Sequence, residues 1–145
     1  MRVVLQRVRS ASVRVDGETV AEIGVGVLAL VGVAAGDGDT EADRAARKLA
    51  EMRIFSDPEG RMNLDAAAAG AAFLVVSQFT LVGSLDRGRR PSFGGAAAPD
   101  VAARQVARLA AGLRDRGFRV EEGRFGASME VELVNDGPVT FVLDT

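Results

Sequence analysis

The chain has no histidine, no cysteine, no tyrosine and no tryptophan, and Lys48 is its single lysine. Without histidine or cysteine, a Ser/His/Asp or Cys/His catalytic arrangement is excluded within one chain. Disulfides and thiolate zinc sites are excluded as well, and carboxylates alone are a poor ligand set for zinc. We therefore expect neither a metal nor a cofactor, and hydroxyl, amide and backbone groups are left as candidates for any chemistry.

The sequence also lacks the segments that cradle nucleotides or enter membranes. It has no GxxxxGK[ST] phosphate loop, and the glycines of "GVGVLALVG" lie within a strand-like run. The longest apolar stretch, from Ile23 to Ala35, is shorter than the ~18 residues that a membrane helix needs. Arg2, Arg7 and Arg9 leave no continuous hydrophobic segment for a secretory signal, so we expect a cytoplasmic protein.

Charge and length limit the class of protein further. The net charge of −2 excludes a generally cationic nucleic-acid binder, so any contact with nucleic acid must be local. A length of 145 residues, with 48% hydrophobic and 26% charged residues, is typical of one globular domain, which we expect to span residues 1–145. A domain of this size buries roughly 68–70% of its unfolded surface on folding.

The first third of the sequence alternates between apolar and polar residues as strands do. Residues 2–8 and "SASVRVDGETVAEI" alternate, Asp16 and Gly17 supply a two-residue hairpin turn, and the run from Ile23 to Val33 predicts a further strand. We predict that these strands form an antiparallel meander. "GFRVEE", "SMEVELVN" and "VTFVLDT" predict three more strands in the last third of the chain.

Two segments have helical periodicity instead. The first helix is predicted from about Glu41 to Arg53, after Asp39 or Thr40 as the N-cap. The second begins at Pro99 and ends before Gly117, and its apolar stripe is formed by Val106, Leu109 and Leu113. The predicted fold class is α+β, with a mostly antiparallel curved sheet or partial β-barrel and two helices.

The motif "SQFTL" places two hydroxyls and an amide where an apolar strand meets a long loop. If the strand continued, Gln78 and Thr80 would share one face and point into one pocket, although an ordinary polar strand end would have the same pattern. Thr80 as a nucleophile would need a base. Because the only neutralisable side-chain amine, Lys48, lies in the first predicted helix, we expect Thr80 to position the substrate or stabilise an oxyanion.

Two further segments combine glycine and proline with polar residues. The loop "VGSLDRGRRPSFGGAAAPD" is longer than most loops, and such loops are often functional, although a solvated arginine loop is the alternative. In "NDGPVTF", Gly137 and Pro138 are typical of a turn before the last strand. Local chemistry does not separate that turn from part of a working site.

These motifs together resemble those of the D-aminoacyl-tRNA deacylases. The resemblance covers nearly the whole chain, and several motifs in the same order are more specific than one alone. It is carried by "LQRVRSASV", "RIFSDPEGRMNL", "VVSQFTL", "RGRRPSF" and "GRFGASMEVELVNDGPVTF". It implies a homodimer that hydrolyses the ester between a D-amino acid and the 3′-terminal adenosine of tRNA, and that acts on glycyl-tRNA as well.

The resemblance also implies roles for individual residues. Gly137 and Pro138 would be joined by a cis bond, and their carbonyls would enter the partner subunit's active site as a filter that excludes L-amino acids. Arg7 is expected to orient this segment. The opposite wall, at the adenosine and the scissile ester, is expected to comprise Ser77, Gln78, Phe79 and Thr80.

The expected contacts with tRNA lie outside this wall. Arg87, Arg89 and Arg90 are candidates for acceptor-stem phosphates, with a solvated loop as the alternative. Phe93 and Phe125 are candidates for stacking on the adenosine, with core packing as the alternative. Two other functions remain open, namely a noncatalytic dimer that binds adenosine or the 3′ end of tRNA, and a purely structural dimer.

Overall fold

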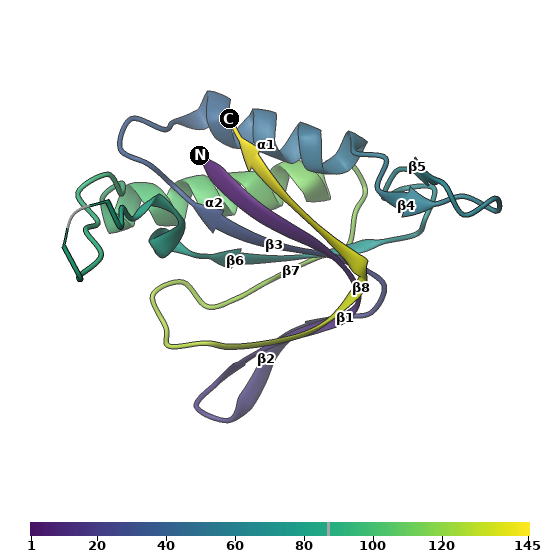
Figure 1. The fold of residues 1–145 in the computed structure, drawn as a ribbon, viewed down its shortest axis with the longest axis horizontal. Helices are drawn as coiled ribbons and strands as arrows, with labels where there is room; N and C mark the ends of the chain where they lie inside the picture. The colour runs from purple at the N-terminus through teal and green to yellow at the C-terminus, as the bar shows by residue number, and fades with distance from the viewer. Residues whose placement is uncertain (87) are drawn as a thin grey trace.

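The computed structural model of the chain describes residues 1–86 and 88–145. It confirms the α+β class: a strongly curved mixed sheet is covered by two helices on one side (Figure 1). The strands are β1 (Arg2–Val15), β2 (Glu18–Ile23), β3 (Gly26–Gly32), β4 (Phe55–Ser56), β5 (Met62–Leu64), β6 (Ala72–Ser77), β7 (Val120–Glu122) and β8 (Glu130–Asp144). The helices are α1 (Asp39–Glu51), the short 3₁₀ helix η1 (Phe79–Val82) and α2 (Pro99–Arg114).

The first three strands do not form the predicted meander. The hairpin turn is confirmed, because β1 and β2 are joined by Asp16 and Gly17 with φ of 51° and 81°. However, β2 and β3 pair with successive parts of β1 and not with each other: Ala11 pairs with Ile23, and Val8 with Gly26. The prediction was wrong because the 14 residues of β1 are long enough to pair with both strands in turn.

The C-terminal strand also differs from the prediction. One strand was expected before Gly137 and Pro138 and another after them, but β8 is one strand. It pairs with β1 along its length, from Arg2 opposite Asp144 to Arg14 opposite Glu130. The long pairings of β1 are antiparallel, whereas β3 with β6 and β6 with β7 pair in parallel. The Gly-Pro segment therefore lies within β8, which pairs with β1.

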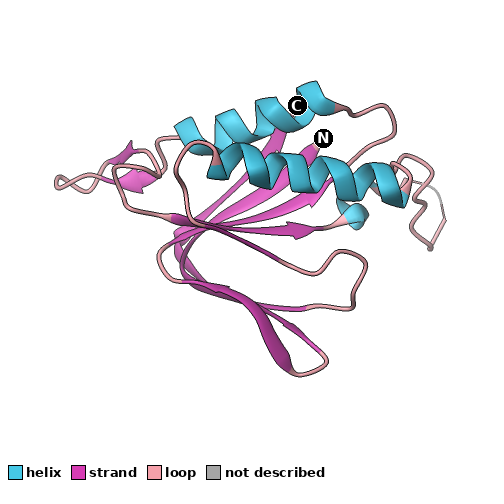
Figure 2. Ribbon diagram, turned by 180° about the vertical axis from the view of Figure 1, so that it is seen from behind, coloured by secondary structure: helices cyan, strands magenta, loops and turns pink. Residues whose placement is uncertain are grey.

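The two main helices lie side by side on one face of the sheet (Figure 2). Helix α2 begins at Pro99 as predicted, and α1 begins earlier than predicted because the Gly38 N–H donates to the Glu41 carboxylate over 2.8 Å, which makes Gly38 the N-cap. Leu49 and Leu109 are buried against the sheet. None of the helices in residues 1–86 and 88–145 is long and apolar enough to cross a membrane.

Two apolar clusters pack against the sheet and hold strand β6 between them. One lies between the helices and the sheet and contains Leu5 and Phe73. The other lies inside the curve of the sheet and contains Val13 and Leu74. Strand β6 lies between them, and it is fully buried from Ala72 to Val76 before it emerges at Ser77.

Candidate active site

The "SQFTL" segment leaves the sheet at the end of β6. Ser77 still pairs with Val31 of β3, and the Gln78 N–H donates to the Val31 carbonyl over 2.7 Å. Helix η1 then begins at Phe79, so the alternation predicted for Gln78 to Leu81 was wrong. The turn packs closely over Gly32, where a Cβ atom would lie 3.0 Å from the Gln78 carbonyl oxygen.

Gln78 and Thr80 nevertheless contact each other. The Gln78 Nε2 atom donates to Thr80 Oγ1 over 2.5 Å, from the residue that precedes η1 to the second residue of that helix. Thr80 is exposed, and Gln78 is half-buried. The amide therefore fixes the position of the hydroxyl oxygen at the surface.

A mainly apolar cavity of about 480 Å³ lies beside this turn. Ser77, Gln78 and Phe79 contribute to its wall, whereas Thr80 is not part of the lining. Its other walls come from the start of α2 and from the β7–β8 loop, and they include Pro99, Ala102, Val106, Phe125, Gly126 and Ala127. The volume falls within the ~300–1,000 Å³ usual for small-molecule sites.

The turn leaves backbone donors beside the cavity. The Leu81 N–H donates to the Gln78 carbonyl, and the Gly83 N–H donates to that of Thr80. The N–H groups of Phe79 and Thr80 have no acceptor within the part of the chain that the structure describes. Two neighbouring free N–H groups at a cavity mouth can stabilise a developing oxyanion.

The arginine loop is closed at its base next to this turn. Ser84 and Ser92 exchange two backbone hydrogen bonds of 2.9 Å, and Arg89 and Arg90 are exposed at the tip. Arg87 lies outside the described residues. Phe93 does not line the cavity: its ring packs edge-on against Phe79 with centroids 4.9 Å apart, and only Phe125 of the two predicted stacking residues is in the lining.

Gly137 and Pro138 lie in a wide bulge of β8. The bond between them is cis, and φ of Gly137 is 137°. The strand pairs Gln6 with Thr140 and Val8 with Asn135, so the segment from Asp136 to Val139 lies opposite the single residue Arg7. Gly137 and Pro138 are exposed, and the register gives neither a partner on β1.

Arg7 fastens this bulge to the body of the protein. It is only 8% exposed, and its Nε donates to the Asp136 carbonyl over 3.1 Å while Nη1 donates to the Ile54 carbonyl over 2.7 Å. The Asp136 carboxylate lies 3.1 Å from the same Nε. The structure therefore places Arg7 in contact with the segment it was expected to orient, while its role in a reaction stays a prediction.

Asn135 is not among the functional residues predicted from the sequence. Its side chain forms three hydrogen bonds across the base of the bulge, with the backbone of Arg7 and Val139. The available signal was the residue type, because asparagine often hydrogen-bonds to backbone a few residues away. No pattern in the sequence names Arg7 as the other partner.

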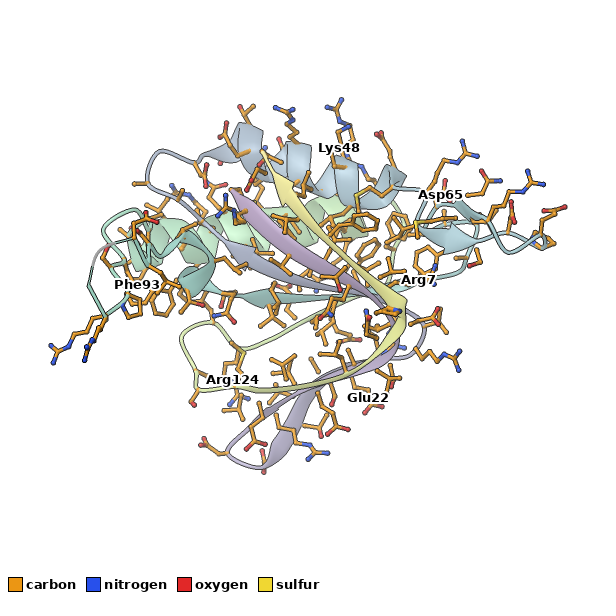
Figure 3. The ribbon with its side chains drawn as sticks, viewed as in Figure 1. Arg7, Glu22, Lys48, Asp65, Phe93 and Arg124 are labelled. Carbon is orange, nitrogen blue, oxygen red and sulfur yellow. The ribbon has the colours of Figure 1, made fainter. Side chains whose placement is uncertain are left out.

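The two motifs lie far apart within one chain. Arg7 pairs with Val27 and Ser77 pairs with Val31, at the two ends of β3. Four residues of a strand span about 13 Å. Figure 3 shows the same separation, with Arg7 beside the bend of β8 and Phe93 beside η1 at the opposite end of the molecule. One chain alone does not bring the two predicted walls together.

Among the described residues, the cavity lining contains no charged side chain. Arg124, beside the cavity residue Phe125, is exposed and forms no ion pair in the described part of the chain (Figure 3). Within residues 1–86 and 88–145, no three acidic residues are grouped so that they could hold a metal ion.

Comparisons with known proteins agree with this geometry. The family model for D-Tyr-tRNA(Tyr) deacylase matches residues 4–144. The D-aminoacyl-tRNA deacylase of Anaeromyxobacter dehalogenans is 52% identical over 100% of this chain and 97% of its own length, and that of Chloroflexus aurantiacus is 53% identical over 100% and 91%.

Solved structures agree with the fold. A c-Myc DNA Unwinding Element Binding Protein superimposes with a TM-score of 0.93 at 35% identity, covering 100% of this chain and 99% of that chain. A probable eukaryotic D-amino acid tRNA deacylase is similar in fold, with a TM-score of 0.86 at 23% identity over 99% and 98% of the two chains. Because the family model and relatives at more than half identity both cover the chain, it belongs to the D-Tyr-tRNA(Tyr) deacylase family.

Proposed function

We propose that this protein hydrolyses the ester of D-aminoacyl-tRNA, releasing the free D-amino acid and tRNA. The observation that carries the proposal is a pair of backbone N–H groups, at Phe79 and Thr80, that have no acceptor among the described residues and lie beside a cavity of about 480 Å³. A hydrolase of carboxylic esters needs such donors where the carbonyl oxygen gains charge. Because the chain belongs to the deacylase family, we take the ester to be that of D-aminoacyl-tRNA.

The attacking group is water, because the chain has no histidine to act as a base. The water oxygen bonds to the ester carbon, and the bond from that carbon to the 3′ oxygen of the adenosine breaks. The neighbouring 2′-hydroxyl of the substrate relays the proton from the water to the leaving 3′ oxygen. The N–H groups of Phe79 and Thr80 hold the oxyanion, and one such donor is worth about 2.7–4 kcal/mol of barrier.

The cavity takes the terminal adenosine. Phe125, 43% exposed in the lining, offers a ring face on which the base stacks. Arg89 and Arg90, exposed on the neighbouring loop, reach phosphates of the acceptor end and add affinity without chiral information. Gln78 orients the Thr80 hydroxyl toward the ester.

The site is completed by a second copy of the chain. Gly137 and Pro138 of the partner subunit close the cavity with their backbone carbonyls, which explains why they are exposed and far from Thr80 within one chain. A fixed backbone wall excludes every L side chain, because it cannot rotate aside. It does not exclude glycine, which has no side chain, so glycyl-tRNA is a further substrate.

Mixed dimers test whether the site is shared between subunits. Gly137→Ala chains should hydrolyse both esters, and Thr80→Ala chains should hydrolyse only the D-ester, and slowly. If the site is shared, random reassociation of equal amounts places the Gly137→Ala filter opposite a wild-type Thr80 in about a quarter of all sites, and only these sites hydrolyse the L-ester rapidly. If each site came from a single chain, about half of all sites would do so.

The reaction itself is tested with one tRNA charged in turn with D-tyrosine and L-tyrosine. We expect the purified protein to release only the D-amino acid rapidly. Binding of both charged tRNAs without hydrolysis of either would support the noncatalytic adenosine-binding dimer instead. Equal hydrolysis of both esters would show that the protein is an esterase that does not distinguish the two enantiomers.

A further inference from the structure

The bulge that presents Gly137 and Pro138 is closed at its base by one side-chain amide. Asn135 Nδ2 donates to the carbonyls of Arg7 and of Val139, each over 3.0 Å. Its Oδ1 accepts from the Val139 N–H over 3.1 Å. The amide therefore both donates to and accepts from Val139, as a paired strand residue would.

This arrangement sets the size and direction of the bulge. The bonds between Asn135 and Val139 close a ring around the three residues Asp136, Gly137 and Pro138, and the bond to Arg7 ties the ring to β1. The Arg7 guanidinium holds the Asp136 carbonyl from the other side. Only a carboxamide carries both an acceptor and a donor with two N–H groups in the required plane.

We propose that Asn135 is a positioning residue for chiral discrimination, a role that rests on the proposed function. It acts through Gly137 and Pro138, whose carbonyls it holds still without touching the substrate. A wall that moves by a fraction of an ångström admits an L side chain. Loss of the Asn135 bonds therefore lowers selectivity more than it lowers the rate on the D-ester.

Asn135→Asp tests the role with almost no change of shape. The variant keeps the oxygen that accepts from Val139 and loses both donated bonds, placing a carboxylate oxygen against two carbonyls. We expect the ratio of kcat/KM for D-tyrosyl-tRNA to that for L-tyrosyl-tRNA to fall by about tenfold, mainly through faster hydrolysis of the L-ester. The control is Asn63→Asp, in β5, whose side chain bonds Arg53 and not the bulge.

An unchanged D-to-L ratio in a folded, dimeric Asn135→Asp variant overturns the positioning role, even if both rates fall. A measurement on the wild type covers the case of a variant that does not fold. Hydrogen exchange at the Val139 amide should be at least about tenfold slower than in an unstructured peptide. Exchange at the unstructured rate would overturn the proposal, and absence of D-ester hydrolysis by the wild type would overturn the proposed function separately.

Discussion

The segments beside the two ends of strand β3 are held by different interactions. At one end, the bulge of β8 is held by charged and amide side chains, with Arg7 and Asn135 bonding its backbone. At the other end, the 3₁₀ turn after β6 packs over Gly32, and the Phe79 and Thr80 N–H groups have no acceptor in residues 1–86 and 88–145. One end carries an exposed bulge held by side chains, and the other lies beside a cavity.

This difference separates selectivity from rate. Groups that hold the bulge should change which enantiomer is hydrolysed, because they fix a wall. Under the proposed function, groups of the turn contact the reacting carbonyl, and they should therefore change how fast both esters are hydrolysed. Substitutions at the two ends should therefore have distinguishable kinetic effects.

The largest effect is expected from Gly137→Ala. A Cβ atom there would lie 2.6 Å from Val139 Cγ2 and 2.9 Å from the Val139 nitrogen, at a φ of 137°, so the wall must shift. We expect the D-to-L ratio of kcat/KM to fall about 100-fold, since a displacement of about 1 Å can cost that much. Gly60→Ala is the control, because Gly60 also has positive φ but open space around it. A variant as selective as the wild type would remove Gly137 from the wall.

Thr80→Ala should slow the reaction without changing its selectivity. The substitution removes the hydroxyl that Gln78 orients over 2.5 Å and leaves the bulge untouched. We expect kcat to fall about tenfold for the D-ester at an unchanged D-to-L ratio, measured under single-turnover conditions. A change in that ratio instead of the rate would contradict the division between the two ends.

A smaller effect is expected from the arginine loop, which belongs to neither wall. Replacing Arg89 and Arg90 by alanine removes two exposed charges. KM for D-tyrosyl-tRNA should rise about tenfold in moderate salt, and the dependence of binding on salt should become shallower by roughly 0.7 per lost phosphate contact. Arg47→Ala, on the exposed face of α1, is the control. Unchanged binding would show that these side chains belong to a solvated loop and do not contact tRNA.

The smallest effect is expected on thermal stability, at the ion pair between Asp43 of α1 and Arg108 of α2, far from both ends of β3. Hydrogen bonds from Arg108, at 2.7 and 2.8 Å, lower the pKa of Asp43 below its ordinary value. Because the folded-state pKa is depressed, the pair contributes stability above the unfolded pKa and loses it as pH falls from about 4. The contribution is small because both groups are exposed. Tm measured at pH 3 and pH 7 should differ less in Asp43→Asn than in the wild type, whereas Asp16→Asn should retain the wild-type difference.

Elements with local chemistry were predictable. The hairpin at Asp16 and Gly17 and the start of α2 at Pro99 follow from turn and helix-start preferences, and the structure has both. The strand predicted through Gln78 and Thr80 was wrong, because packing over Gly32 ends β6 at Ser77. Phe93 was a candidate for stacking on the adenosine, with packing as the alternative, and in the structure its ring packs against Phe79 and does not line the cavity.

The sequence by itself determined which chemistry is possible. The absence of histidine and cysteine leaves water, hydroxyls and backbone groups, and the ordered motifs indicate the family. The tertiary structure decided where these groups lie. Arg7 and Asp136 meet across 129 positions of the chain only because β8 pairs with β1, and this register depends on the whole sheet, not on local preference. The pairing of β3 with β1 and with β6 places the two motifs at opposite ends of β3, because residues along one strand are separated by its fixed rise.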